Sequence, residues 1–101
     1  MLVSNYTFNI SKEAVGSWET FWTILLQHEW KNHEHVHDMK AYFLVTEVEN
    51  DGKTYAIQTF FQSEAGFNAF HSYFESYLLP LIHKQYPGQY VYFQTLLATW
   101  D

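Results

Sequence analysis

The sequence predicts an α+β fold, built from one sheet and two helices in the order strand, helix, strand, strand, helix, strand. Three observations support this prediction. Four segments rich in β-branched and aromatic residues carry the apolar patterns of strands. Two longer segments carry apolar residues at helical spacing. Between the two middle strands lies the turn sequence Asn50-Asp51-Gly52, which indicates a hairpin.

The composition is that of one compact domain, which we expect to span residues 1–101. The chain is 48% hydrophobic and 21% aromatic, which excludes a disordered or low-complexity protein. Its 5 basic residues are all lysine and face 11 acidic residues, for a net charge of −6. Arginine, whose planar guanidinium group binds phosphates and base edges, is absent. We therefore expect no nucleic-acid partner and no anionic membrane partner.

Several kinds of site lack their residues in this sequence. There is no cysteine, which excludes disulfides, thiolate metal sites and cysteine nucleophiles. No glycine-rich phosphate loop and no His-Glu-x-x-His pair occurs, so we expect no cofactor. The N-terminus has no signal pattern, and no apolar run approaches the ~20 residues of a membrane helix. We therefore expect a cytoplasmic protein.

The first half of the chain predicts a strand and a helix. Residues 2–10 alternate between mostly apolar even positions and mostly polar odd positions, as in a strand with one buried face. Ser11 offers an N-cap for a helix over residues 12–30. The helix has an apolar arc that covers more than half its circumference, wider than contact with one sheet face requires. We expect this helix to contact something besides its own sheet.

The second half of the chain predicts a hairpin, a helix and a last strand. Residues 41–49 and 54–62 are strand-like, whereas the polar, histidine-rich segment 30–40 has no assigned structure. Ser63 caps a helix whose apolar face includes Phe67, Phe70, Phe74, Tyr77 and Leu78. Pro80 predicts a kink or a restart of that helix. Residues 90–99 form the last strand.

This order of elements is the ferredoxin-like βαββαβ pattern. Right-handed crossovers place both helices on one face of a four-stranded antiparallel sheet. The other face should be polar if it meets water, yet large apolar side chains occur on both sides of three strands. We therefore expect a homodimer through the open sheet face, which makes a dimeric α+β barrel. The alternative is a monomer with an amphipathic, tyrosine-rich face.

Four stretches resemble a family of short bacterial proteins, the domain of unknown function 4286 family. They are Trp18-x-x-Phe21-Trp22, the Thr-Tyr-Ala-Ile-Gln strand at 54–58, Leu-Leu-Pro-Leu at 78–81 and Phe93-x-Thr95-x-Leu97. The resemblance spans nearly the whole chain. It implies a ferredoxin-like domain of the dimeric α+β barrel type and no established activity. His28 matches the histidine of a His-Ile-Pro step in the family, although Glu29-Trp30 follows it here. The architecture also resembles cofactor-independent monooxygenases and related small-ligand barrels.

Polar residues fall on the apolar faces of both helices. At ~100° per residue, Glu29 lies between Trp18 and Trp22 in the apolar arc, and His28 lies at its edge. In the second helix His71 falls among phenylalanines. The predicted ligand-binding set is therefore His28, Glu29, His71, Trp18, Trp22, Phe67 and Phe74.

A buried Glu–His pair between helices and sheet could serve as a general acid or base on a small apolar or aromatic ligand. The alternatives are that Glu29 turns to solvent and that His71 is a core histidine with one hydrogen bond.

A second cluster is His33-x-His35-x-His37. In an extended segment alternate residues share a face, so the three imidazoles would converge. Three nitrogens and a water suit zinc or copper. The alternative is a solvated polar linker.

These observations leave three functional hypotheses. The first is a small-ligand binding or sensing module with an aromatic pocket between helices and sheet. The second is a small cofactor-independent enzyme of the monooxygenase-like barrel type. The third is a purely structural or interaction dimer. The first two require an aromatic-lined cavity that touches His71, and the third requires solid packing there.

Overall fold

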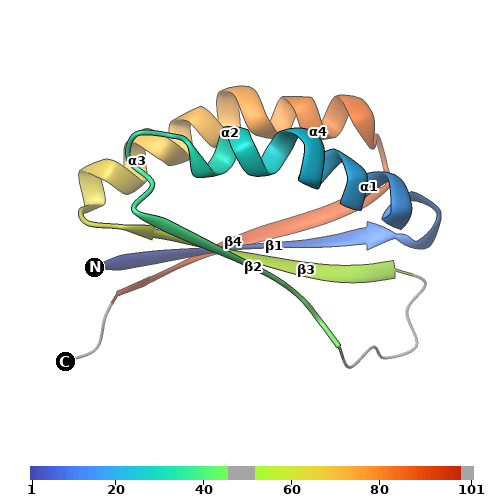
Figure 1. Cartoon of the computed structure of the whole chain (residues 1–101), viewed down its shortest axis with the longest axis horizontal. Helices are drawn as coiled ribbons and strands as arrows, with labels where there is room; N and C mark the ends of the chain where they lie inside the picture. The colour runs from blue at the N-terminus through green and yellow to red at the C-terminus, as the bar shows by residue number, and fades with distance from the viewer. Residues whose placement is uncertain (46–51, 99–101) are drawn as a thin grey trace.

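A computed structural model describes residues 1–45 and 52–98 and confirms the predicted α+β, ferredoxin-like architecture (Figure 1). Its four strands are β1 (Leu2–Ser11), β2 (Asp38–Phe43), β3 (Gly52–Phe61) and β4 (Tyr90–Ala98). They form one antiparallel sheet in the order β2-β3-β1-β4. Both helical segments cover the same face of the sheet, and the other face carries no helix.

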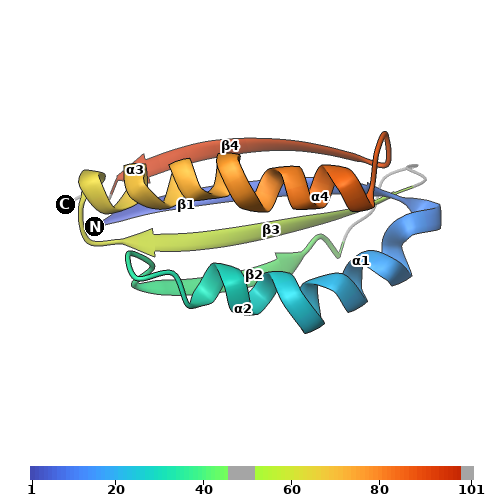
Figure 2. The same ribbon diagram turned by 90° about the horizontal axis from the view of Figure 1, so that it is seen from above.

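Each helical segment is a succession of short helical elements. The first consists of η1 (Lys12–Ala14), α1 (Val15–Phe21), η2 (Trp22–Leu26) and α2 (Gln27–Lys31). The second consists of α3 (Glu64–Tyr73), η3 (Phe74–Leu78) and α4 (Leu79–Gln85). Figure 2 shows the first segment running along the β2 edge of the sheet and the second lying beside it over the other strands. Among the described residues, no helix combines the length and the apolar character needed to cross a membrane.

A π-helical turn lies in the middle of each helical segment. The N–H of Gln27 donates to the carbonyl of Trp22, and the N–H of Leu79 donates to the carbonyl of Phe74. These bonds reach back five residues, so each turn holds one residue more than an α-helical turn. The fully buried side chains accordingly recur at every fourth position: Leu26 and Trp30 in the first segment, and Phe70, Phe74, Leu78 and Ile82 in the second. In a straight α-helix, side chains four residues apart point in directions that differ by roughly 40°.

The strand register separates the two faces of the sheet. Tyr6, Phe8 and Ile10 of β1 point toward the helices and are fully buried. Tyr6 pairs with Ile57 of β3, which lies in the same core. The alternation predicted for residues 2–10 is therefore confirmed, and the core lies between β1, β3 and the two helical segments.

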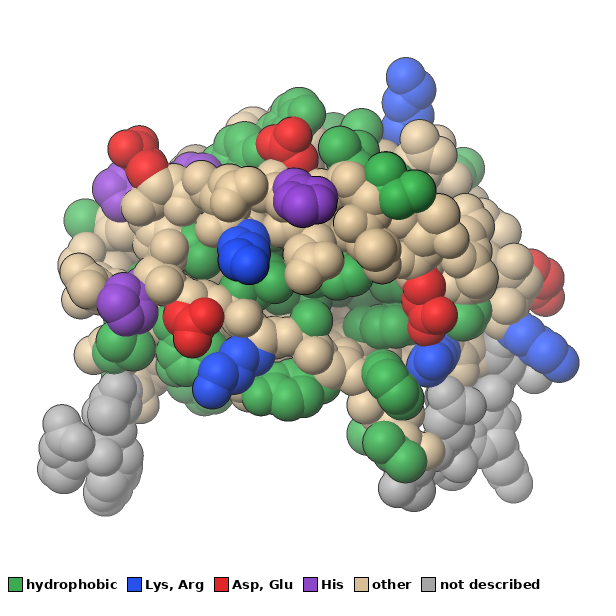
Figure 3. Space-filling model, viewed as in Figure 1, with side chains coloured by type: hydrophobic (Ala, Val, Ile, Leu, Met, Phe, Trp, Pro, Cys, Tyr) green, Lys and Arg blue, Asp and Glu red, His purple; other side chains and the backbone are tan. Residues whose placement is uncertain are grey.

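The open face has apolar margins and a polar centre. Val91 and Phe93 of β4 are 69% and 60% exposed, and Tyr42 of β2 is 51% exposed. Between them the central strand β1 presents Asn5 and Thr7. Figure 3 shows hydrophobic side chains along the lower side of the molecule, where the sheet lies. Large apolar groups thus occur on both faces, as the sequence predicts.

The two predicted helix caps have different outcomes. Ser63 caps α3, because its Oγ accepts a hydrogen bond from the Gly66 N–H at 3.1 Å. The cap predicted at Ser11 is wrong, because Ser11 Oγ makes no cap bond and donates to the carbonyl of Gln89 at 3.0 Å. Pro80 lies in the first turn of α4, directly after the π-helical turn, so the predicted restart of the helix is confirmed.

The hairpin begins earlier than the sequence predicts. β2 starts at Asp38 rather than residue 41, because the His37 N–H already donates to the carbonyl of Phe60 at the end of β3. The histidine-rich segment therefore leads directly into the edge strand. Predicted strand residues 46–49, Asn50 and Asp51 of the turn, and residue 99 lie outside the described residues.

Candidate functional site

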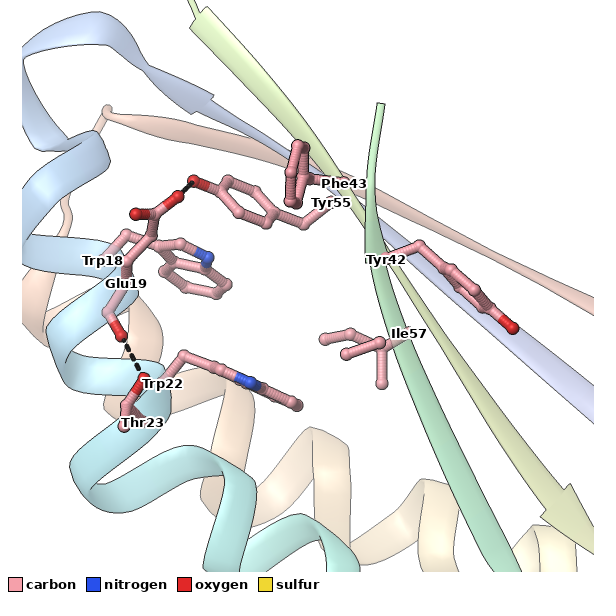
Figure 4. Close-up of a pocket in the computed structure, with 9 residues that line it drawn as sticks. Trp18, Glu19, Trp22, Thr23, Tyr42, Phe43, Tyr55 and Ile57 are labelled. Carbon is pink, nitrogen blue, oxygen red and sulfur yellow. Dashed lines mark hydrogen bonds between the residues drawn. The ribbon is translucent and has the colours of Figure 1, made fainter. Parts of the chain in front are cut away.

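A cavity of about 290 Å³ lies between the first helical segment and the β2–β3 edge of the sheet (Figure 4). Nine residues line it: Trp18, Glu19, Trp22, Thr23, Ala41, Tyr42, Phe43, Tyr55 and Ile57. An apolar cavity of ~150 Å³ holds benzene in another protein, so this one has room for a substituted aromatic ring.

The walls follow from the helix spacing and the strand register. Trp18 and Trp22 lie four residues apart, so both indoles face the sheet. Opposite them Ile57 of β3 pairs with Ala41 of β2. Because Ala41 is small, it leaves space between the edge strand and the indoles. The Tyr42 side chain points away from the cavity, as the alternation along a strand requires.

A charged network lies at the rim of the cavity. The Glu19 carboxylate accepts hydrogen bonds from the Tyr55 hydroxyl and from Lys53 Nζ, the latter at 3.0 Å. Lys53 Nζ also lies 4.3 Å from the centre of the Phe43 ring, within cation–π range. The hydrogen bond from Tyr55, and then that from Lys53, lowers the pKa of Glu19. Glu19 therefore carries a negative charge at neutral pH and links α1 to β3.

His71 lies in a packed region rather than at this cavity. Its ring stacks on Phe67 and Phe74, at centroid distances of 5.2 and 5.9 Å. Its Nδ1 lies 2.9 Å from the hydroxyl of Tyr6, whose pKa is raised chiefly by burial. His71 Nε2 lies 3.7 Å from the carboxylate of Glu75. This arrangement is the alternative in which His71 is a core histidine with a hydrogen-bond partner, and it is the packing that a purely structural dimer requires there. The prediction that a ligand cavity touches His71 is therefore wrong, because the aromatic cavity lies beside the first helical segment instead.

The placement predicted for Glu29, between Trp18 and Trp22, is wrong. The π-helical turn at 22–26 rotates the residues after it, so Trp30 takes the buried position and donates to Thr59 Oγ1 at 2.8 Å.

Glu29 instead reaches across to the second helical segment. Its carboxylate accepts a hydrogen bond from the Tyr73 hydroxyl at 3.0 Å. Burial, followed by the Glu29 carboxylate, raises the pKa of Tyr73 to about 12. His28 is exposed. Glu29 and His71 therefore have different hydrogen-bond partners, and neither lines the aromatic cavity.

The three predicted metal ligands do not converge. The Val36 N–H donates to the carbonyl of His33 at 3.0 Å, so this segment turns instead of extending. The rings of His33 and His35 lie 5.7 Å apart, and burial followed by nearby His35 lowers the pKa of His33. His37 Nδ1 lies 3.2 Å from the side-chain nitrogen of Gln62. Within residues 1–45 and 52–98, no group of three or more His, Cys, Asp or Glu residues could hold a metal ion.

The site therefore retains two predicted residues, Trp18 and Trp22, and gains several that the sequence did not single out. Glu19 was missed because its neighbours Tyr55 and Lys53 are distant in sequence. Ala41 was missed because its importance depends on its pairing with Ile57. The alternation along β3 is the one sequence signal that places Tyr55 and Ile57 on a common face.

Comparison with known proteins identifies a family and a fold. The family model described as Domain of unknown function (DUF4286) matches residues 1–100. No curated protein matches the chain.

Solved structures share the fold at low sequence identity. A candidate antibiotic biosynthesis monooxygenase from Deinococcus radiodurans is 9% identical with a TM-score of 0.74, over 100% of this chain and 94% of that chain. An ethyl tert-butyl ether D (EthD) family protein from Bacillus halodurans is 9% identical with a TM-score of 0.71, over 99% and 100%. A dimeric ferredoxin-like protein from an uncultured marine organism is 10% identical with a TM-score of 0.67, over 99% and 96%. At these identities the likeness shows the fold alone.

Proposed function

This chain belongs to the DUF4286 family, and we propose that it is a small-ligand binding module whose cavity takes a single-ring aromatic or apolar molecule. The observation that carries this proposal is the cavity of about 290 Å³ walled by the rings of Trp18, Trp22, Phe43 and Tyr55. Ligand sites are typically concave and mostly apolar, with a few polar groups that fix orientation. Aromatic walls supply a large contact area for a flat ligand.

The position of the polar groups favours binding over catalysis by the predicted acid–base pair. Glu29 is engaged by Tyr73 and His71 by Tyr6, both outside the cavity lining. At the rim, the Tyr55 hydroxyl and Lys53 Nζ both donate hydrogen bonds to the Glu19 carboxylate. The cavity therefore suits a binding or sensing role, which does not require the predicted acid–base pair in its lining.

Filling the cavity tests the proposed function. Ala41→Leu adds a branched side chain where Ala41 lines the cavity. We expect this variant to bind toluene at least tenfold more weakly than the parent in ligand-observed NMR. Ala69→Leu, at an exposed position of α3, is the matched control and should bind as the parent does. Equal binding by Ala41→Leu and the parent would contradict the proposal.

We also propose that a second copy of the chain covers the open sheet face. Three observations support this assembly: Val91, Phe93 and Leu97 of β4 are all substantially exposed; they lie on the face that carries no helix; and two solved structures with this fold are described as dimeric ferredoxin-like proteins. Burial of such a patch is the usual reason for its presence on a small protein.

Light scattering tests the assembly directly. We expect a particle of twice the 12.1 kDa chain mass at micromolar concentration. Val91→Asp should produce monomers. Ile24→Asp is the matched control, because Ile24 is equally exposed, at 69%, but lies on the helical side. A monomeric parent, or dissociation by both variants alike, would contradict the proposed interface.

A further inference from the structure

Trp18 is a buried side chain with an unused hydrogen-bond donor. It is 1% exposed, yet its indole N–H donates to no group within residues 1–45 and 52–98. Trp30, which is equally buried, donates to Thr59 Oγ1 at 2.8 Å. Buried tryptophan N–H groups normally have such a partner. The difference between the two indoles therefore requires an explanation.

The cavity supplies that explanation. In the described part of the chain, Asn5 Oδ1 is the one side-chain polar atom that is both fully enclosed by protein and without a partner, and it lies on the other face of the sheet. The Trp18 nitrogen also has no partner but is not fully enclosed, so it borders open space. Figure 4 shows the nitrogen edge of Trp18 facing the space between the two indoles and Ile57. An acceptor atom on a bound molecule would complete its hydrogen bonding.

The rim limits the charge that such a molecule can carry. Glu19 is ionised at neutral pH because Tyr55 and Lys53 hold its pKa low. Lys53 Nζ is already paired with this carboxylate at 3.0 Å, and the chain has a net charge of −6. An anionic ligand would meet the carboxylate at the rim, whereas a neutral ligand would not.

We infer that the cavity selects neutral single-ring aromatic molecules that carry an oxygen acceptor beside the ring, as aryl ketones do. The Trp18 indole N–H donates to that oxygen, and the Glu19 carboxylate excludes anionic analogues. This inference rests on the proposed function, because it names the class of ligand for the same cavity.

Three probes of similar size test the acceptor requirement. Acetophenone is neutral and carries an acceptor, ethylbenzene lacks the acceptor, and benzoate is an anion. In ligand-observed NMR titrations we expect Trp18→Phe to weaken acetophenone binding by about fivefold, the usual net contribution of one hydrogen bond, and ethylbenzene binding by less than about twofold. Phe43→Leu, which trims a cavity wall that has no hydrogen-bond donor, should change the binding of both probes by the same factor.

A second arm tests the charge requirement without altering the core. Glu19→Gln should raise the affinity for benzoate relative to the affinity for acetophenone severalfold. Glu13→Gln removes a charge from an exposed position of η1 and should change neither. The Glu19→Gln and Glu13→Gln measurements still test the inference if Trp18→Phe does not fold.

The outcomes separate the inference from the proposed function. Equal weakening of acetophenone and ethylbenzene by Trp18→Phe, or benzoate binding to the parent as tight as that of acetophenone, would overturn the inference and leave an unselective aromatic site. Failure of acetophenone and ethylbenzene alike to bind the parent would overturn the proposed function itself.

Discussion

The layer between helices and sheet has a packed half and an open half. In the packed half, Phe70, Phe74 and Leu78 are fully buried against the central strand β1. In the open half, Trp18 and Trp22 face the short edge strand β2 across a cavity. A central strand has neighbours on both sides, so its residues are enclosed by adjacent side chains. An edge strand with a small residue facing the helix leaves space instead.

The two halves also differ in the hydrogen bonding of their polar groups. In the packed half the Tyr6 hydroxyl bonds to His71, and the Trp30 indole bonds to Thr59. In the open half the Trp18 indole has no such partner, and Glu19 lies at the rim. Open space therefore lies where the core is incomplete, and not where the polar residues of the helices are most buried. This is the part of the domain where we propose the ligand site.

The largest expected effect is in the packed half. Phe74→Ala should lower the free energy of unfolding by about 3–5 kcal/mol, because it leaves a void in a fully buried cluster. Trp22→Ala should cost less, since Trp22 is half-buried beside an existing cavity. Urea denaturation of both variants measures the difference. Equal losses would remove the distinction between the two halves.

A smaller effect concerns hydrogen-bond pairing. Thr59→Val should lower the free energy of unfolding by about 1–3 kcal/mol, because it leaves the buried Trp30 N–H without an acceptor. Thr23→Val is the matched change in the open half. Its hydroxyl donates to the Glu19 carbonyl on the exposed helix surface, so we expect a change within about 0.5 kcal/mol. Similar losses in the free energy of unfolding for the two variants, measured by urea denaturation, would contradict the difference in hydrogen bonding between the packed and the open half.

The smallest expected effect is a pH dependence at the rim of the open half. The pKa of Glu19 lies below its ordinary value of 4.5, so its ionised form stabilises the fold above that pH. This stabilisation is lost as the pH falls through the lower pKa of the folded state. The side chain is 47% exposed, so the effect should be only a few tenths, about 0.3 kcal/mol.

Denaturation between pH 7 and pH 3 measures this contribution as the stability difference between the parent and Glu19→Gln. The difference should be largest near neutral pH and should shrink below pH 4.5. Glu13→Gln should show no such trend. A constant difference over the whole range would show that the rim network does not depend on the charge of Glu19.

Much of the fold could be predicted from the sequence because its signals are local. The alternation in residues 2–10 and the helical periodicity of the two longer segments report burial directly. The position of Glu29 could not be predicted from a spacing of ~100° per residue, because the π-helical turn departs from it. The sequence did contain a signal for this turn: large apolar residues recur every four positions at Trp18, Trp22, Leu26 and Trp30.

The cavity could be predicted only in part. Helical spacing places Trp18 and Trp22 on the sheet-facing side, and both line the cavity. Its opposite wall depends on the pairing of Ala41 with Ile57, which is fixed by the start of β2 in the segment that has no apolar periodicity. The predicted pocket at His71 is occupied by packed rings for the same reason, since cross-strand pairing and not helix position decides where space remains.

The most direct test uses the indole N–H signals of the 4 tryptophans in a nitrogen–proton correlation spectrum. On titration with acetophenone, we expect the Trp18 signal to move most and the Trp22 signal to move less. The Trp30 signal should stay in place, because its N–H is bonded to Thr59 away from the cavity. A Trp18 signal that stays fixed at saturating acetophenone, or a Trp30 signal that moves as far, would contradict an aromatic ligand site in the open half.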